Sequence, residues 1–237
     1  MLSRTCITER DGARRETLED ERKQIAAASR RLASEGLVLG TAGNLSACRD
    51  SLVAITPSGA QLESLDPEQV VVVDLEGRLV EGDLEPSSEL GLHLGIYRRF
   101  QTGAVVHTHA PMATALSCVL DELPCVHYQM LLLGGTVRVA PYETFGTAEL
   151  AESVIEALEG RAAALMANHG AITHAAGVDA AVELSLLLEW ACTIYWRAAM
   201  LGEPRALDET QREAVIAAAV ERSYGTLRPA GEQQEST

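Results

Sequence analysis

The chain has 237 residues, a formal net charge of −15 and a sequence pI near 4.8. This acidity argues against nucleic-acid and anionic-membrane partners, because binding to either depends on clustered lysine and arginine. The length suits one compact domain that buries roughly three quarters of its unfolded surface, and no Pro/Gly/Ser-rich linker divides it. We therefore predict a single domain over 1–237, with flexible termini at 1–16 and 223–237.

Cysteine usage and the N-terminal charges predict a cytoplasmic location. The cysteines are scattered, odd in number and without a CxxC pair, which indicates neither a disulfide framework nor a cysteine zinc site. The charged N-terminus lacks the apolar stretch of a signal peptide. Residues 180–201 are apolar and long enough to span a bilayer, but Glu183, Glu189 and Arg197 would be costly at its centre. We read this segment as a core helix.

Helical and strand patterns alternate along the chain, which predicts α/β layers. A helix over 17–35 ends at Gly36, and a turn at Glu76-Gly77 joins two strands into a hairpin. In chain order we predict a helix over 17–35, strands over 52–56, 70–73 and 78–80, a helix over 89–100, a strand over 104–109, a helix over 111–119, strands over 125–132 and 137–140, a helix over 147–158, a strand over 162–167, and helices over 178–201 and 208–222.

Two histidines at the end of the apolar run 104–109 predict part of a metal site. His107 and His109 are two residues apart, so in a strand both imidazoles point to one face, with their α carbons roughly 6.5 Å apart. A lone pair of this kind is more often two hydrogen-bonded histidines than a metal site. His169 strengthens the metal interpretation because it follows a second apolar strand, and Gly170 after it permits a sharp exit or a close backbone approach. Three histidines and one vacancy suit catalytic zinc.

The chain has a single lysine, Lys23, which lies in a charged cluster typical of a solvated helix face. Schiff-base chemistry is therefore not expected. The sequence also has no GxSxG, GxGxxG or Walker pattern, so serine hydrolysis and the usual nucleotide folds have no support. The predicted metal is left to do the electrophilic work.

An ordered set of motifs over 17–225 resembles the class II aldolase/adducin family, and within it the L-fuculose-phosphate aldolases. The motifs are Thr41-Ala-Gly-Asn44-Leu-Ser46, Ile55-Thr-Pro-Ser-Gly59, Pro86-Ser-Ser-Glu89, Val105-Val-His-Thr-His-Ala-Pro111, Ala140-Pro-Tyr142, Phe145-Gly146 and Asn168-His-Gly170. The resemblance implies a three-layer α/β/α fold around a mixed, mostly antiparallel sheet. It also implies a homotetramer with active sites at subunit interfaces.

Carried over by motif, the resemblance makes His107, His109 and His169 the ligands of one Zn²⁺ per subunit, or of another divalent metal. Glu89 becomes the catalytic acid/base, which would suit a carboxylate whose pKa is raised toward neutrality by burial. Without the family motif, Ser87-Ser88-Glu89 could equally be a helix cap.

Small polar segments without lysine are predicted to bind the substrate phosphate. Hydroxyls, backbone N–H groups and a helix N-terminus can hold an anion without a cationic side chain. Each segment alone could be an ordinary turn, and the family motifs favour binding for the set. The predicted residues are Thr41, Gly43, Asn44, Ser58, Gly59, Ser87 and Ser88.

Three further residues receive roles from the resemblance or from their spacing. Tyr128 matches a tyrosine that reaches the neighbouring subunit's site to serve the oxygen released on carbon–carbon cleavage. Tyr224 matches a tyrosine of the C-terminal tail, although such a residue is often a surface anchor. His93 lies four residues after Glu89, where it could support the site or be a structural histidine.

The function implied is reversible cleavage of a ketose 1-phosphate, such as L-fuculose 1-phosphate, to dihydroxyacetone phosphate and a short aldehyde. Activity on a 5-deoxypentulose 1-phosphate is also compatible with the sequence. A pentulose-5-phosphate 4-epimerase is less favoured, because the family's epimerases have aspartate where this chain has Glu89. Metal-dependent dehydratases and decarboxylases of the same family stay open. An adducin-like interaction module is disfavoured by the intact histidines and Glu89.

Overall fold

The computed structural model describes the backbone of residues 8–222 and the side chains of residues 18–222. A nine-stranded sheet forms its middle layer, in the order β4-β3-β2-β1-β5-β9-β8-β7-β6. Adjacent strands are antiparallel except β7 and β8, which are parallel. The strands are β1 Asn44–Arg49, β2 Leu52–Ile55, β3 Val71–Asp74, β4 Leu79–Glu81, β5 Ala104–Thr108, β6 Glu122–Leu123, β7 Val137–Ala140, β8 Ala163–Met166 and β9 Gly170–Ala175.

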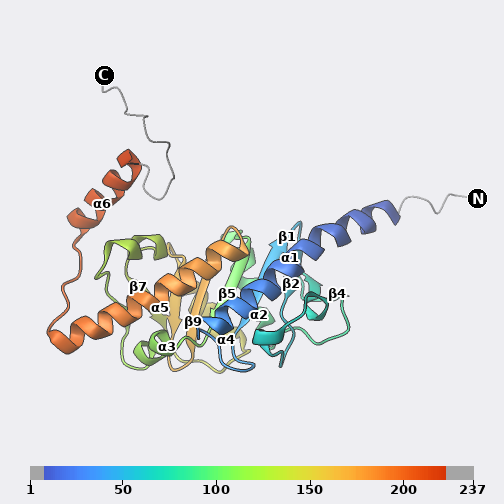
Figure 1. Cartoon of the computed structure of the whole chain (residues 1–237), viewed down its shortest axis with the longest axis horizontal. Helices are drawn as coiled ribbons and strands as arrows, with labels where there is room; N and C mark the ends of the chain where they lie inside the picture. The colour runs from blue at the N-terminus through green and yellow to red at the C-terminus, as the bar shows by residue number, and fades with distance from the viewer. Residues whose placement is uncertain (1–7, 223–237) are drawn as a thin grey trace, which may run out of the picture.

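Helices cover both faces of the sheet (Figure 1). One face packs against α1 (Thr8–Ser34), α3 (Pro111–Ser117) and α5 (Val178–Leu201). The other packs against α2 (Leu90–Phe100) and α4 (Ala148–Leu158). The predicted three-layer α/β/α fold with a mixed, mostly antiparallel sheet is therefore confirmed.

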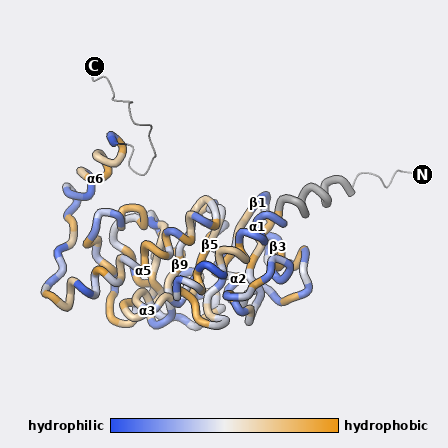
Figure 2. The backbone as a smooth tube through the Cα atoms, in the orientation of Figure 1, coloured by the Kyte–Doolittle hydropathy of each residue, from blue (hydrophilic) through white to orange (hydrophobic). Residues whose placement is uncertain are grey.

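The remaining helical elements lie outside these two layers. Figure 1 shows α6 (Glu209–Arg222) standing away from the sheet, and α6 has no buried residue. Short 3₁₀ helices complete the described chain: η1 Leu62–Ser64, η2 Pro67–Gln69 and η3 Tyr128–Leu133. Hydrophobic residues predominate along α5, which crosses the sheet (Figure 2). No helix among residues 8–222 is both long and apolar enough to cross a membrane.

Strand β5 lies at the centre of the sheet, between β1 and β9, and all five of its residues are buried. Its alternate side chains enter the two core layers, with Val106 on the α1/α5 side and Val105 on the α2/α4 side. A strand buried on both faces reads as a continuous apolar run, which is why the sequence predicted it. In register, His107 lies opposite Asn44 of β1 and Ile172 of β9.

Three strands were missed: β6 (Glu122–Leu123), which has only two residues, and β1 and β9, whose places depend on pairing with β5. Strand β1 (Asn44–Arg49) is rich in small and polar residues. Strand β9 begins at Gly170, where the sequence had suggested an exit from β8, because a tight turn at residues 167–169 reverses the chain directly. Strands β1 and β9 both pair with β5. This pairing makes them strands despite their weak intrinsic β-propensity.

The predicted strand over 125–132 is wrong. That region contains the end of the loop after β6 and the 3₁₀ helix η3. His127 starts η3 because its imidazole Nδ1 accepts a hydrogen bond from the Gln129 N–H at 3.2 Å. Gly134 ends it in a left-handed conformation, with φ +98°.

Other sequence predictions agree with the structure or lie outside it. The hairpin is confirmed by the antiparallel pair β3–β4, with Gly77 at φ +83° in its turn. Helix α1 begins at Thr8 rather than at residue 17, while residues 1–7 and 223–237 lie outside the described part. Each of the four cysteines in that part is a free thiol. The single-domain assignment over the full length stays a prediction.

Candidate metal centre and active site

The three predicted metal ligands lie together at one end of the central strands. His107 is in β5, His109 follows its last residue, and His169 is in the turn between β8 and β9. The ring centroids are 4.8 to 5.0 Å apart in each of the three pairs. One ligand atom from each residue lies within 4.8 Å of the other two. Because β5 and β9 are neighbours in the sheet, three histidines from two distant parts of the sequence lie around one point.

Gly170 makes this approach possible. A Cβ atom at this position would lie 2.3 Å from the Thr108 carbonyl oxygen and 3.3 Å from Cε1 of His107. Only a residue without a side chain lets β9 pack so closely against β5. Asn168 in the preceding turn has φ +55°, a left-handed conformation that asparagine tolerates. The close backbone approach suggested by the sequence is confirmed.

The donor set fits a divalent metal bound by imidazole nitrogens. The His107 Nδ1–H donates to the Ala171 carbonyl oxygen at 3.0 Å, so Nε2 faces the other histidines and Glu89. That Nε2 lies 3.0 Å from Nε2 of His109 and 3.2 Å from Oε2 of Glu89. Two imidazole nitrogens at this distance repel each other through their lone pairs unless a proton or a cation lies between them. The arrangement is therefore complete only with a positive charge at its centre.

Burial favours the neutral, ligand form of two of these histidines. Desolvation, followed by the nearby charge of His107, lowers the pKa of His109 to about 4. The same two causes lower the pKa of His169. For His107, burial alone would lower the pKa, but the charge and hydrogen bond of Glu89 raise it overall. Of the three histidines, His107 is thus the one whose protonated form is most stabilised by the neighbouring carboxylate.

Glu89 directs its carboxylate at the histidines rather than at its own helix. It occupies the N-cap position of α2 but makes no side-chain capping hydrogen bond. Its Oε2 accepts a hydrogen bond from Nδ2 of Asn44 at 2.8 Å and lies 3.2 Å from Nε2 of His107. Its Oε1 is 3.6 Å from Nε2 of His169 and has no hydrogen-bond partner. The helix-cap alternative considered from the sequence is excluded.

The pKa of Glu89 differs from the sequence-based expectation. Burial does raise it, but the positive charge of His107 and hydrogen bonds from His107 and Asn44 outweigh burial and hold the pKa below its ordinary value. The lowering depends mainly on His107 as an imidazolium. The carboxylate is therefore ionised in the structure as it stands.

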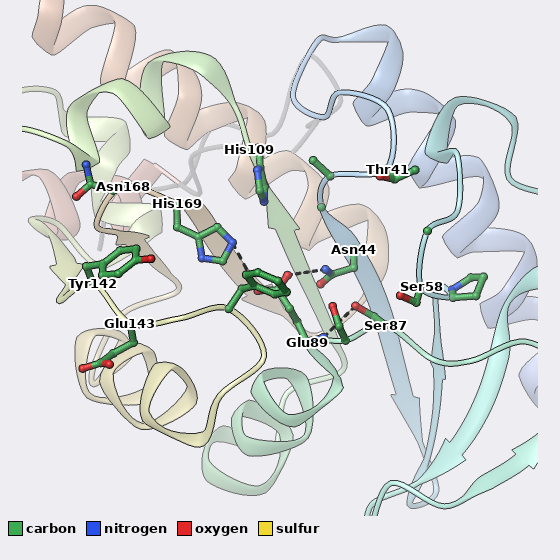
Figure 3. A pocket seen from close by; sticks show the side chains of 16 residues that line it. Thr41, Asn44, Ser58, Ser87, Glu89, His109, Tyr142, Glu143, Asn168 and His169 are labelled. Carbon is green, nitrogen blue, oxygen red and sulfur yellow. Dashed lines mark hydrogen bonds and ion pairs between the residues drawn. The ribbon is translucent and has the colours of Figure 1, made fainter.

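Every predicted phosphate-binding residue lines one cavity of about 300 Å³, together with Glu89, His109 and His169. Figure 3 shows Thr41, Ser58 and Ser87 on the wall opposite His169. Gly43 fits there with φ +90° because a Cβ would lie 2.9 Å from the His107 carbonyl oxygen. The full predicted set in this wall is Thr41, Gly43, Asn44, Ser58, Gly59, Ser87 and Ser88.

Some backbone donors expected to bind phosphate already have partners. The Ser58 N–H donates to the Glu85 carbonyl oxygen, the Ser87 N–H donates to that of Thr56, and the Glu89 N–H donates to the Ser87 hydroxyl. The hydroxyl groups of the wall are thus more available than these three backbone amides. No lysine or arginine lines this cavity among the described residues.

The opposite rim contains residues that received no role from the sequence. Tyr142, Glu143, Phe145 and Asn168 line the same cavity, and Tyr142 and Phe145 are 62% and 65% exposed. Three of them lie in motifs quoted for the family resemblance, which was the one signal available for them. An exposed aromatic residue in a loop has no periodic pattern that marks it as functional.

Of the two predicted tyrosines, only Tyr128 lies in the described part of the chain, and it does not line this cavity. Tyr128 is 40% exposed in η3, beside the His127 ring, and lines a separate apolar cavity of about 490 Å³ with residues of α6. Tyr224 lies outside the described residues. Any catalytic role of Tyr128 therefore requires a second subunit.

Comparison with known proteins identifies the family. Residues 23–196 match the model of the Class II Aldolase and Adducin N-terminal domain. The chain belongs to this family. It is 42% identical over 199 residues to a 5-deoxy-D-ribulose 1-phosphate aldolase of Bacillus thuringiensis serovar kurstaki, a match covering 83% of this chain and 93% of the relative. The resemblance stated from the motifs is confirmed.

Two further relatives support the same assignment. A 5-methylthioribulose-1-phosphate/5-deoxyribulose-1-phosphate aldolase of Rhodospirillum rubrum is 41% identical over 191 residues, covering 80% of this chain and 86% of the relative. A solved L-fuculose 1-phosphate aldolase superposes with a TM-score of 0.81 at 37% identity, covering 84% of this chain and 95% of that one. The chain is thus an aldehyde-lyase of the class II aldolase type.

Proposed function

We propose that this protein is a zinc-dependent aldolase that reversibly cleaves a ketose 1-phosphate into dihydroxyacetone phosphate and a short aldehyde. The observation that carries the proposal is one cavity in which an ionised Glu89 faces three clustered histidines, opposite a wall of hydroxyl groups. A metal, a proton carrier and a phosphate site are the three parts that such a cleavage needs without a lysine.

His107, His109 and His169 would hold the metal. A bound divalent cation supplies a Lewis acid that polarises the substrate carbonyl and stabilises the charge that develops beside it. Three imidazole nitrogens suit zinc, with a fourth position open to substrate, and a different divalent ion is tested by the experiment below. The remaining chemistry belongs to side chains of this chain.

Glu89 would exchange the proton at carbon. When the bond between the third and fourth carbons breaks, the fourth carbon becomes the aldehyde and its hydroxyl proton departs. The electron pair stays with the third carbon, which must then receive a proton. Glu89, ionised before the reaction, would take this proton up from solvent and deliver it to that carbon. Oε1 of Glu89 suits this step because it lies near the histidines and has no other hydrogen-bond partner.

The hydroxyls of Thr41, Ser58 and Ser88 would bind the substrate phosphate, assisted by the open backbone at Gly43 and Gly59. An acidic chain benefits from such a site, because it selects phosphate by geometry without a basic cluster. Tyr128 of a neighbouring subunit in a homotetramer would relay the hydroxyl proton, taking it up on its oxygen while its own phenolic proton passes to solvent. Its exposure and its absence from the cavity of its own chain support that assignment.

The substrate we favour is a 5-deoxypentulose 1-phosphate. The relatives named for 5-deoxyribulose 1-phosphate share 42% and 41% identity with this chain, against 37% for the L-fuculose 1-phosphate aldolase structure. All three names describe a ketose 1-phosphate, so the dihydroxyacetone phosphate half would be the same for each.

The test is a substrate comparison with the metal-loaded protein. Zinc, manganese or cobalt is supplied to the metal-depleted chain, which is then given 5-deoxyribulose 1-phosphate, L-fuculose 1-phosphate or ribulose 5-phosphate. We expect release of dihydroxyacetone phosphate from the ketose 1-phosphates, fastest from the deoxypentulose. Xylulose 5-phosphate formation without cleavage would indicate an epimerase instead, and bound metal with no reaction on any substrate would overturn the proposal.

A further inference from the structure

A line of buried polar side chains runs from Glu89 into the core between α2 and β1. Glu89, His93 and Tyr97 are spaced four residues apart on one face of α2, while Asn44 and Ser46 are two apart on the facing strand. All five are at most 6% exposed. Buried polar groups are costly unless they are hydrogen-bonded, so this line must be satisfied internally.

The line is continuous. Nδ2 of Asn44 donates to Oε2 of Glu89 at 2.8 Å, a contact drawn in Figure 3. Oδ1 of Asn44 lies 2.6 Å from Nε2 of His93, whose Nδ1 lies 2.6 Å from the Ser46 hydroxyl. The Ser46 hydroxyl is in turn 2.6 Å from the Tyr97 hydroxyl. Four hydrogen bonds thus join the catalytic carboxylate to the core.

One direction of donation satisfies all four of these hydrogen bonds. Asn44 presents its NH₂ group to Oε2 of Glu89 and its carbonyl oxygen to Nε2 of His93. Nε2 of His93 must then carry the hydrogen. Complete burial is the main reason that the pKa of His93 is lowered to about 3, so the ring is neutral and Nδ1 is an acceptor. Ser46 therefore donates to Nδ1 and accepts from Tyr97.

We infer that His93 is a positioning residue for the proposed cleavage: by donating from Nε2 it fixes the Asn44 amide, which anchors Oε2 of Glu89 and leaves Oε1 to exchange the proton. This inference rests on the proposed function of Glu89. With the opposite tautomer, Asn44 would turn its carbonyl oxygen toward the carboxylate, and two acceptors would face each other. The tautomer of a buried histidine thus sets the orientation of a carboxylate two hydrogen bonds away.

A buried polar pair elsewhere in the chain provides the contrast. Thr173 and Ser185 join β9 to α5 through a hydroxyl–hydroxyl bond of 2.7 Å, and both side chains are buried. Neither residue lines the cavity or contacts Glu89. This pair can affect stability but cannot orient the carboxylate, so it supplies a matched control.

The first experiment compares His93→Leu with His93→Gln. Leucine fills the site without a donor, whereas the glutamine amide can offer NH₂ to Asn44 and its oxygen to Ser46. We expect His93→Leu to lower kcat by about tenfold to a hundredfold, with KM and metal content changed by less than about threefold. His93→Gln should recover most of that loss. Wild-type kcat in His93→Leu would overturn the inference.

The second experiment covers the case in which His93→Leu does not fold. Ser46→Ala removes the donor to Nδ1 and the hydrogen-bond partner of the Tyr97 hydroxyl. Ser185→Ala removes a hydroxyl of similar burial in the control pair. We expect kcat to fall about threefold to tenfold in Ser46→Ala and to stay at the wild-type value in Ser185→Ala, although both lose some thermal stability. Equal kcat in the two variants would contradict a positioning role.

A third measurement does not depend on activity. Nitrogen-15 NMR of the histidine side chains should show His93 protonated at Nε2 alone in the wild-type protein, and a mixture of tautomers in Ser46→Ala. A wild-type ring protonated at Nδ1 would overturn the inference even in an active enzyme. If the wild-type protein cleaves no ketose 1-phosphate, the proposed function fails, while this spectrum still decides whether Asn44 is oriented as inferred.

Discussion

Two groups of residues in the active site are held in place by different interactions: the histidine wall (His107, His109 and His169) and the Glu89 wall (Glu89 with Asn44 and His93). The histidine wall is fixed by backbone pairing, since His107 lies within the β5 ladder and His169 in the turn that begins β9. The Glu89 wall is fixed by side chains, because the carboxylate turns away from its own helix and is held by Asn44, which is in turn hydrogen-bonded to His93. Backbone pairing is insensitive to most substitutions, whereas one substitution can remove any hydrogen bond in a series of side chains.

This difference predicts which variants lose the metal and which lose only turnover. Changes in the histidine wall should remove both, because the ligands and the strands that hold them form one unit. Changes in the Glu89 wall should leave the metal in place and reduce the rate of proton exchange. The predictions below test that separation, in order of decreasing effect.

His109→Ala should have the largest effect. Removing one of three nitrogens leaves too few ligands to hold the cation, so we expect loss of bound metal and a fall in turnover of about a thousandfold or more. Metal analysis and a dihydroxyacetone phosphate assay measure the two quantities. His174→Ala is the control, since His174 stacks on Phe100 and bonds the Arg161 carbonyl oxygen away from the cluster. Metal retained at the wild-type level in His109→Ala would refute its role as a ligand.

Glu89→Gln should separate the two walls. The amide keeps the shape and can still accept a hydrogen bond from Asn44, but it cannot carry the proton. We expect metal content to stay at the wild-type level and kcat to fall by about a hundredfold to ten-thousandfold. Steady-state kinetics on the metal-loaded variant measure this. Full turnover would exclude Glu89 as the acid/base, and loss of the metal would show that the two walls are not independent.

Gly170→Ala should weaken the histidine wall through the backbone. The added Cβ would lie 2.3 Å from the Thr108 carbonyl oxygen, so β9 must move away from β5. We expect a loss of about 1–3 kcal/mol in the free energy of unfolding, together with weaker metal binding. Gly177→Ala is the control because nothing lies within 4 Å of its Cβ position and its φ is not positive. Equal denaturation midpoints for the two variants would rule out this account.

The same difference explains what could be predicted from the sequence. The histidine wall was visible because His107, His109 and His169 follow apolar runs, and buried strands are read from such runs. The polar segment of β1 was not recognised as a strand, although it supplies Asn44 and Ser46.

The Glu89 wall could be predicted only in part. The spacing of Glu89 and His93 placed both on one helix face, but spacing does not reveal that Asn44 lies between them. Long-range side-chain hydrogen bonds have no local signal, and the rim residues Tyr142 and Phe145 were visible only as parts of family motifs. Positions that depend on pairing between distant segments therefore needed the structure.

The smallest predicted effect is a pH dependence of stability that belongs to the Glu89 wall. His93 is completely buried, and burial lowers its pKa from 6.5 to about 3 despite the opposing charge of Glu89. Between these two values the unfolded chain binds a proton that the folded chain does not. The contribution of His93 to the free energy of unfolding is therefore largest above pH 6.5. Between pH 6.5 and about 3 it declines as the pH falls, by about 1.4 kcal/mol for each pH unit.

Glutamine at position 93 binds no proton, so His93→Gln should lose this dependence while all other groups titrate as before. Urea unfolding at pH 7, 6 and 5 measures the difference in free energy between wild type and variant, which should shift in favour of the variant as the pH falls. Parallel curves would show that His93 is protonated in the folded protein as readily as in the unfolded chain. In that case Nδ1 would not be an acceptor, and the orientation of Asn44 would need another cause. A difference that grows only below pH 6.5 would instead show that the folded protein keeps His93 neutral, as the hydrogen bonds to Asn44 and Ser46 require.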